Sequence, residues 1–203
     1  METMWPWEHV VVGYLAYSLF ARTYYRQSPD ALETIAVVFA SLLPDLIDKP
    51  LAWEYGVFES GYALGHSVFF AVPLSLAVGL LARRVGRDRA GVAFGLGYLL
   101  HLPADVIPIY VRRGEWPIER VLWPVRSAPP DRGSAGFREQ FLAMVGEYQR
   151  DLLAGELSSV EWVGLGLVAF TTLLWLADGA PVVRELLAGG SSAIRRAAGR
   201  LVQ

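Results

Sequence analysis

Residues 160–177 read VEWVGLGLVAFTTLLWLA, with a single charged side chain, Glu161, near the beginning. An apolar stretch of about 18 residues or more is a candidate for crossing a bilayer core about 30 Å thick as one α-helix. Four further stretches of the chain come close to this pattern: His9–Tyr25, Ala31–Trp53, Tyr62–Ala82 and Ala90–Val111. The sequence therefore predicts an all-α fold, a polytopic membrane helical bundle with about five transmembrane helices.

The composition agrees with a membrane protein and excludes several other classes. Of the 203 residues, 54% are hydrophobic and 19% are charged, whereas soluble domains are roughly 45–50% apolar and about 25% charged. The formal net charge of −2 provides no basic field to bind nucleic acid. The chain has no cysteine, which excludes disulfides, thiolate zinc ligands and a cysteine nucleophile.

The distribution of arginine predicts the orientation. The connection at 83–89, RRVGRDR, holds four arginines, and the connection between the second and third apolar stretches holds none. Basic residues in short loops favour the cytoplasmic side. We therefore expect a multi-pass protein of the inner (cytoplasmic) membrane with its N-terminus outside and its C-terminus in the cytoplasm, where the basic tail would lie: Arg184, Arg195, Arg196 and Arg200.

The segment 112–159 is too polar for the bilayer. Four prolines in its first half prevent a long helix there. From Gly136 onward, apolar residues recur at helical spacing beside charges, which predicts an amphipathic helix on the membrane surface or over the bundle. The chain thus divides into a four-helix membrane core (1–111), this polar segment (112–159), and a fifth helix with a basic tail (160–203).

All three histidines and three aspartates lie at or inside the predicted spans. Ionisable groups are costly in a membrane and are therefore functional by default. Neighbouring antiparallel helices alternate in direction, so the starts of odd helices and the ends of even helices share one side of the bilayer. This places six side chains in one layer near the outer interface: His9, Asp45, Asp48, His66, His101 and Asp105.

The spacing of these residues suits a metal site. His101 and Asp105 are four residues apart, and Asp45 and Asp48 three apart, so each pair shares one face of its helix. Three imidazoles with two or three carboxylates suit Zn²⁺, with Mn²⁺ as the alternative. Taken singly, each of these residues is more often a cap or an interfacial hydrogen-bonding group. A proton relay, which also uses Asp and His, is the rival interpretation of the whole set.

Five motifs in order carry a family resemblance: WEHVVVGYL, SLLPDLIDKP, GHSVFF, GYLLHLPADVIP and LWPV. Together they resemble the bacterial and archaeal family of inner-membrane metal-dependent hydrolases (the YdjM-type family), over about residues 5–125, and the opening looks like archaeal members. More distantly, the order His, Asp, His, His-x-x-x-Asp is similar to the zinc-dependent phospholipase C and single-strand nuclease superfamily. Those helical enzymes cleave phosphoesters with clustered zinc ions.

The resemblance implies a ligand set and a role for one carboxylate. Asp105 matches the aspartate that bridges two metals in the soluble superfamily. No histidine follows His101, whereas the soluble enzymes have further ligands downstream, so we expect one or two divalent ions rather than three. The implied ligands are His9, Asp45 or Asp48 after the proline, His66, His101 and Asp105.

The predicted function is a membrane-embedded metal-dependent hydrolase, a phosphoesterase acting on a lipid or lipid-linked phosphate. A metal ion lowers the pKa of a bound water towards about 7, and the member of the pair Asp45/Asp48 that binds no metal is the candidate general base. Arginines near the end of the fourth span are candidates for binding the phosphate, although arginines at a helix end often only snorkel: Arg112, Arg113 and Arg126.

Two other functions remain open at this point. The protein is alternatively a membrane protein with a structural metal site and no catalysis, or an ion or proton transporter. The sequence has no His-Glu-x-x-His, which argues against zinc-dependent proteolysis. The expected partners are membrane lipids and a lipid or phosphoester substrate, and no nucleic acid.

Overall fold

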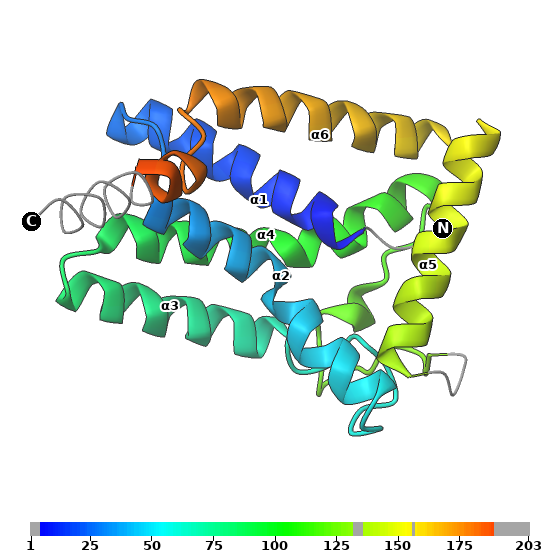
Figure 1. Ribbon diagram of the computed structural model, residues 1–203. Helices are drawn as coiled ribbons and strands as arrows, with labels where there is room; N and C mark the ends of the chain where they lie inside the picture. The colour runs from blue at the N-terminus through cyan, green and yellow to red at the C-terminus, as the bar shows by residue number, and fades with distance from the viewer. Residues whose placement is uncertain (1–4, 132–135, 156, 189–203) are drawn as a thin grey trace, which may run out of the picture.

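The computed structural model describes residues 5–131, 136–155 and 157–188. Every regular element within these residues is helical, as predicted, and residues 183–188 form a short helical piece after the last long helix (Figure 1). The expected tail residues Arg195, Arg196 and Arg200 lie outside the described residues. The six long helices are α1 (Pro6–Phe20), α2 (Ala31–Trp53), α3 (Val68–Arg84), α4 (Asp88–Arg113), α5 (Phe137–Ala154) and α6 (Ser159–Ala177).

Helix α4 is the centre of the bundle. It packs most extensively against α2, then against α3 and α1, while α6 lies along α1 (Figure 1). Gly97 allows the closest approach, because a Cβ atom there would lie 2.5 Å from the carbonyl oxygen of Val37 and 3.1 Å from Ser41 Oγ. The missing side chain thus lets the backbone of α2 touch α4 one turn before His101.

Helix α2 begins at a capping box and changes direction along its length (Figure 1). The Asp30 carboxylate accepts a 2.8 Å hydrogen bond from the Glu33 amide, and Glu33 in turn accepts one from the Asp30 amide. Pro44 lies inside the helix, where proline removes a hydrogen bond and its ring clashes with the preceding turn. The bend explains how the second half of α2 reaches the loops at one end of the bundle.

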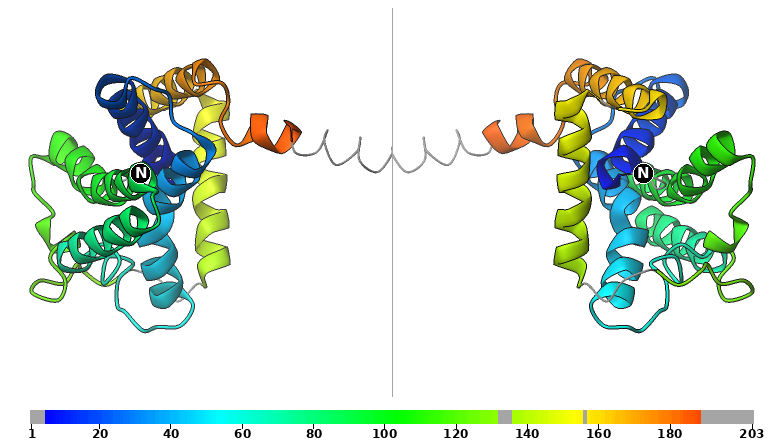
Figure 2. Two further views of the ribbon diagram at one scale, coloured as in Figure 1. Left: turned by 90° about the vertical axis from the view of Figure 1, so that its left-hand side faces the viewer. Right: turned by 90° about the vertical axis from the view of Figure 1, so that its right-hand side faces the viewer.

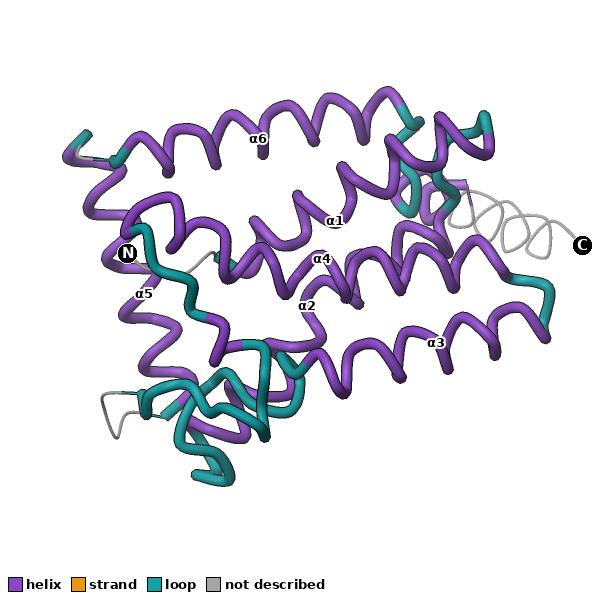
Figure 3. Tube along the Cα trace, turned by 180° about the vertical axis from the view of Figure 1, so that it is seen from behind, coloured by secondary structure: helices purple, strands orange, loops and turns teal. Residues whose placement is uncertain are grey.

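Two loops lie at this same end, together with the start of α1 (Figure 3). They are residues 54–67, between α2 and α3, and residues 114–131, after α4. Asp131 connects the second loop to the first, because its Oδ2 accepts hydrogen bonds of 2.7 Å from Trp53 Nε1 at the end of α2 and from the Gly61 amide in the first loop. The Val68 amide also donates to the Val121 carbonyl at 2.9 Å. The two loops therefore form one cap over the end of the bundle.

Helix α5 runs across this end rather than along the bundle (Figures 1 and 2). The helix expected from Gly136 onward thus begins at Phe137 and lies over the bundle. Aromatic contacts hold it. The ring of Tyr148 lies 5.1 Å from that of Trp5 at the start of α1, and the ring of Phe137 lies 6.0 Å from that of Trp53 at the end of α2.

The number of membrane crossings is not confirmed. By length and composition, α4 is the one helix among the described residues that is long and apolar enough to span a membrane, and Glu161–Ala177 is a shorter apolar helix. Helix α3 has only 17 residues, fewer than the roughly 20 that a span needs, and α1 has 15 before it continues as a π-helix over Ala21–Tyr25. The third apolar stretch, expected to begin at Tyr62, starts as a helix only at Val68. The structure therefore supports one span where the sequence predicted five.

Candidate metal centre

Five of the six predicted ligands lie together in the interior, at the end of the bundle that carries the two loops. Each of the five side chains belongs to a residue no more than 6% exposed. They come from α1 (His9), α2 (Asp45), the loop before α3 (His66) and α4 (His101 and Asp105). Their atoms form two groups able to hold a metal ion, each with ligand atoms within 4.8 Å of one another: His9 with His101 and Asp105, and Asp45 with His66 and His101.

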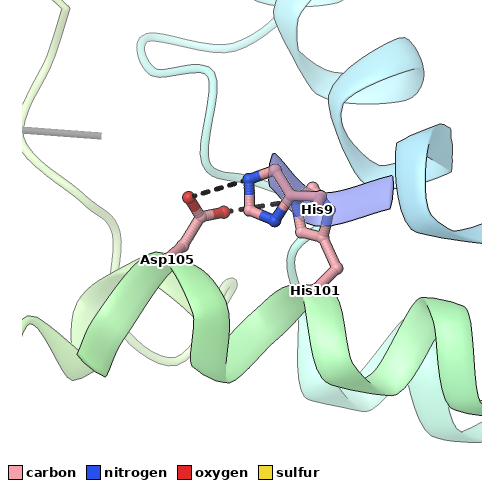
Figure 4. Close-up of side chains that lie close together, drawn as sticks. All are labelled: His9, His101 and Asp105. Carbon is pink, nitrogen blue, oxygen red and sulfur yellow. Dashed lines mark ion pairs between the residues drawn. The ribbon is translucent and has the colours of Figure 1, made fainter. Parts of the chain in front are cut away.

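The Asp105 carboxylate faces all three histidines. Its Oδ1 lies 3.5 Å from His9 Nε2, and its Oδ2 lies 3.2 Å from His101 Nε2 and 3.4 Å from His66 Nε2. Figure 4 shows Asp105 beside His9 and His101, whose rings are stacked with centroids 3.8 Å apart. Asp105 therefore borders both groups of ligands.

Asp45 approaches the same histidines from α2. Its Oδ1 lies 3.4 Å from His66 Nε2 and 3.8 Å from His101 Nε2. The same oxygen forms a 2.7 Å ion pair with Lys49 Nζ, one helical turn away. Lys49 is also buried, so this pair belongs to the interior.

Asp48 has a different position from the other five residues. Its Oδ2 accepts hydrogen bonds from His66 Nδ1 at 2.8 Å and from the amides of His66 and Ala63, and its Oδ1 accepts one from the Gly65 amide at 2.7 Å. It belongs to neither group of ligands. Asp48 thus lies behind His66 and fixes the orientation of its ring and the conformation of its loop. The sequence left open whether Asp45 or Asp48 would face a metal, and in the structure it is Asp45 that belongs to a group of ligands.

The hydrogen bonds of the two central histidines define their proton positions. His101 Nδ1 lies 2.7 Å from the carbonyl oxygen of Ser41, which can only accept, so Nδ1 carries a proton. His66 Nδ1 donates to Asp48 in the same way. In neutral imidazoles with this tautomer, both Nε2 atoms are lone-pair acceptors, and they lie 3.1 Å apart.

Several polar atoms at this point are buried without a hydrogen-bond partner among the described residues: both ring nitrogens of His9, Oδ2 of Asp45 and Oδ2 of Asp105. Buried polar atoms are nearly always satisfied in native structures. Inward-facing imidazole nitrogens and carboxylate oxygens are also the donor set that Zn²⁺ and Mn²⁺ take. These residues therefore fit a divalent ion.

Tyr62 and Arg120 adjoin the cluster, and the sequence did not indicate either residue. The Tyr62 ring lies 4.8 Å from the His66 ring, its hydroxyl accepts a hydrogen bond from Arg120 Nη1 at 3.2 Å, and the guanidinium carbon lies 4.3 Å from the ring centroid. Burial, together with the nearby Asp105 carboxylate, raises the pKa of Tyr62 well above its usual value. No spacing rule connects a loop tyrosine to an arginine 58 residues later.

The three arginines predicted to bind phosphate have exposed side chains. Arg112 and Arg113 end α4, and Arg112 interacts electrostatically with Glu8 and Glu161. Arg126 follows Trp123 and Pro124 in the loop after α4. Arg120 is partly buried beside Tyr62, and it is thus the arginine that this loop brings nearest to the histidine cluster.

A family model supports the resemblance seen in the sequence motifs. The model of the YdjM inner membrane protein family matches residues 4–180. No curated protein and no solved structure matches the chain. The chain therefore belongs to the YdjM inner membrane protein family, and its place is in the inner membrane. The number of crossings and the orientation of the termini stay predictions.

Proposed function

We propose that this member of the YdjM inner membrane protein family is a metal-dependent hydrolase that cleaves a lipid or lipid-linked phosphoester. The observation that carries the proposal is the contact between His66 Nε2 and His101 Nε2 at 3.1 Å. Two lone pairs at this distance repel each other unless a proton or a metal ion lies between or beside them. The Asp45 and Asp105 carboxylates, within 3.8 Å of these nitrogens, add the negative charge that a divalent ion requires.

The two groups of ligands suggest where an ion would bind, and they share His101, whose free lone pair on Nε2 can serve only one ion at a time. One group is His9, His101 and Asp105, and the other is Asp45, His66 and His101. Asp105 has one oxygen towards His9 and the other towards His66 and His101, which suits a carboxylate shared between two ions. A single ion held by His66, His101 and both carboxylates is the simpler occupancy. Zn²⁺ fits such nitrogen and oxygen ligands best, and Mn²⁺ is the alternative.

The chemistry requires a nucleophile and a base. A divalent ion bound here would supply an acidified water and positive charge for the phosphoryl oxygens. Asp48, which lies outside both groups of ligands, already accepts four hydrogen bonds, so the predicted assignment of the base to the carboxylate that binds no metal does not suit it. Asp45 faces the histidines through Oδ1, and its Oδ2, which has no hydrogen-bond partner among the described residues, is the oxygen that would accept the proton of the attacking water. The water oxygen then bonds to phosphorus, the ester P–O bond breaks, and the leaving alkoxide takes a proton from solvent.

Metal content tests the proposal directly. Detergent-purified wild type is compared by elemental mass spectrometry with His101→Ala and Asp105→Ala, and with Asp88→Asn as a control at the opposite end of α4. We expect one or two equivalents of zinc or manganese in wild type and in the control, and loss in the other two. Metal-loaded wild type should hydrolyse a member of a panel of lipid phosphoesters. Absence of metal, with all variants folded alike, would favour a proton relay instead.

A structural metal site is the second candidate, and the burial of the ligands favours it. His9, His66 and His101 are at most 2% exposed, and closed sites of this kind stabilise a fold without leaving an open position for water. Chelation separates the two functions. A structural ion should lower the melting temperature strongly on removal while no phosphoester is cleaved; a catalytic ion should restore hydrolysis when it is added back.

A further inference from the structure

Arg120 lies beside the candidate metal centre, against the Tyr62 ring that contacts His66. Its guanidinium donates one hydrogen bond to the Tyr62 hydroxyl and lies over the Tyr62 ring. It forms no ion pair with a carboxylate in the part of the chain that the structure describes. An arginine has five N–H donors in a fixed fork that matches a carboxylate or phosphate. Most of the donors of Arg120 are therefore available to a ligand.

Tyr62 connects this arginine to a cavity as well as to the metal ligands. A cavity of about 330 Å³ is formed by residues 57–60 with Tyr62, Ala63, Trp123, Ser127 and Ala128. Ligand sites in proteins begin at about this size. The Tyr62 ring also contacts His66. Tyr62 thus lies between the cavity and the histidine cluster. Arg120 is hydrogen-bonded to this same tyrosine.

Lys49 brings a second positive charge to the same neighbourhood. Its stem passes Gly61, since a Cβ atom on Gly61 would lie 3.3 Å from Lys49 Cγ, and its ammonium group pairs with Asp45 at 2.7 Å. The next residue after Gly61 is Tyr62. Lys49, from α2, and Arg120, from the loop after α4, therefore lie against two consecutive residues of the loop between α2 and α3, Gly61 and Tyr62.

We propose that Arg120, held over Tyr62 and assisted by Lys49, forms an anion-binding subsite beside the metal centre that takes the phosphate group of the substrate. This inference rests on the proposed function, because the metal ions would act on the phosphate that the subsite holds. Arg120 provides directional hydrogen bonds and Lys49 a compact charge. The cavity next to Tyr62 is the space for the group esterified to that phosphate.

Binding of inorganic phosphate to the full-length, zinc-loaded protein in detergent tests the subsite by isothermal titration calorimetry. Arg120→Gln should raise the Kd for phosphate about tenfold, equivalent to about 1.4 kcal/mol, with zinc content unchanged. Arg120→Lys keeps the positive charge and should raise the Kd for phosphate about threefold. Arg84→Gln, at the far end of α3, is the matched control and should bind phosphate as wild type does.

Equal phosphate affinity in wild type, Arg120→Gln and Arg120→Lys would overturn the subsite. If Arg120→Gln does not fold, the Arg120→Lys variant alone tests the subsite. A Kd for phosphate equal to that of wild type in this variant would contradict a role for the paired N–H donors of the guanidinium group. Wild type that holds zinc and phosphate but cleaves no phosphoester would overturn the proposed function and leave the subsite standing. An active hydrolase whose Arg120→Gln variant binds phosphate normally would overturn the subsite alone.

Competition distinguishes the source of the phosphate. Phosphatidic acid in mixed micelles and glycerol 3-phosphate in solution are compared as competitors of inorganic phosphate, with diacylglycerol micelles as the uncharged control. Stronger competition by phosphatidic acid identifies a lipid headgroup, and equal competition identifies a soluble ester. In both cases the competition must weaken in Arg120→Gln, and competition that is independent of Arg120 would contradict the proposal.

Discussion

His66 and His101 face each other through Nε2 atoms 3.1 Å apart, and each ring is fixed from behind through Nδ1. The partner behind His66 is the Asp48 carboxylate, and the partner behind His101 is the Ser41 carbonyl. Both partners belong to α2, although the histidines come from a loop and from α4. One helix therefore orients two ligands that it does not itself carry, as outer hydrogen-bond partners of metal-binding histidines commonly do.

Replacing Asp48 by Asn should weaken metal binding without removing a ligand. The amide cannot accept from His66 Nδ1 and three backbone amides as a carboxylate does, so we expect about 10- to 100-fold lower zinc affinity. Buried donors left unsatisfied should also lower the free energy of unfolding by about 3 kcal/mol. Zinc titration and denaturant unfolding measure the two effects, with Asp88→Asn as control. Zinc affinity equal to that of wild type would show that Asp48 does not orient His66.

Gly65 should tolerate no larger side chain. A Cβ atom there would lie 2.8 Å from the Pro44 carbonyl oxygen and 3.1 Å from Pro44 Cα, and backbone atoms cannot move aside as a side chain can. Gly65→Ala should therefore cost about 1–3 kcal/mol in unfolding free energy. Gly79→Ala, where a Cβ atom meets nothing within 4 Å, should be neutral or stabilise α3 by up to about 1 kcal/mol. Equal melting temperatures for the two variants would contradict the close contact.

The Asp178 cluster should matter for stability and not for metal binding. Asp178 follows α6 and accepts hydrogen bonds from Tyr14, Ser18 and Arg22 at 2.7–2.8 Å, at the opposite end of α1 from His9. Asp178→Ala leaves the buried hydroxyls of Tyr14 and Ser18 without their acceptor and should lower the unfolding free energy by about 2–3 kcal/mol. Zinc content should stay at the wild-type value. Loss of zinc from a folded Asp178→Ala protein would mean that the two ends of α1 are coupled.

Tyr62 should make stability fall at alkaline pH. Its pKa is raised in the folded state, so above the unfolded-state value of about 10 the folded chain keeps a proton that the unfolded chain has lost. The stabilisation is present below about pH 10 and is lost as pH rises beyond it, at about 1.4 kcal/mol per pH unit. Tyr62→Phe removes this contribution. Denaturant unfolding from about pH 9 to about pH 11 should therefore show a shallower decline in the variant. If the unfolding free energy declined equally steeply with pH in wild type and in Tyr62→Phe, the pKa of Tyr62 would not be raised in the folded state, and its hydroxyl would be in contact with solvent.

The positions of the helices were largely predictable, because apolar stretches and helix-breaking residues can be recognised within a short segment of sequence. Helix α2 has the predicted bounds, Ala31–Trp53, and α6 differs from its prediction by one residue at its start. The third helix starts at Val68 instead of Tyr62 for a reason that no local signal carries. Asp48 accepts the amides of Ala63, Gly65 and His66, so this segment is held as a loop by a residue in another helix.

The gathering of His9, Asp45, His66, His101 and Asp105 followed from the alternation of helix direction and from the cost of ionisable groups in apolar spans. The separate roles of Asp45 and Asp48 did not, because both lie on one face of α2 and only the position of the loop 54–67 distinguishes them. Arg120 was missed for a related reason. It reaches the cluster through a tertiary contact with Tyr62, whereas Arg112 and Arg113 were predicted because they follow the fourth apolar stretch, and Arg126 because it follows Trp123 and Pro124.

The hydrogen bonds behind His66 and His101 also bear on the energetics of ion capture. Both rings are already oriented by the protein itself, through Asp48 and Ser41. An arriving ion would therefore lose little free energy to ordering the chain, since preorganised ligands bind without that cost. The metal-free protein should accordingly be a folded receptor, in contrast to small zinc domains that fold only around their ion. Metal exchange would then follow the opening of loops at one end of the bundle, and not the unfolding of the helices.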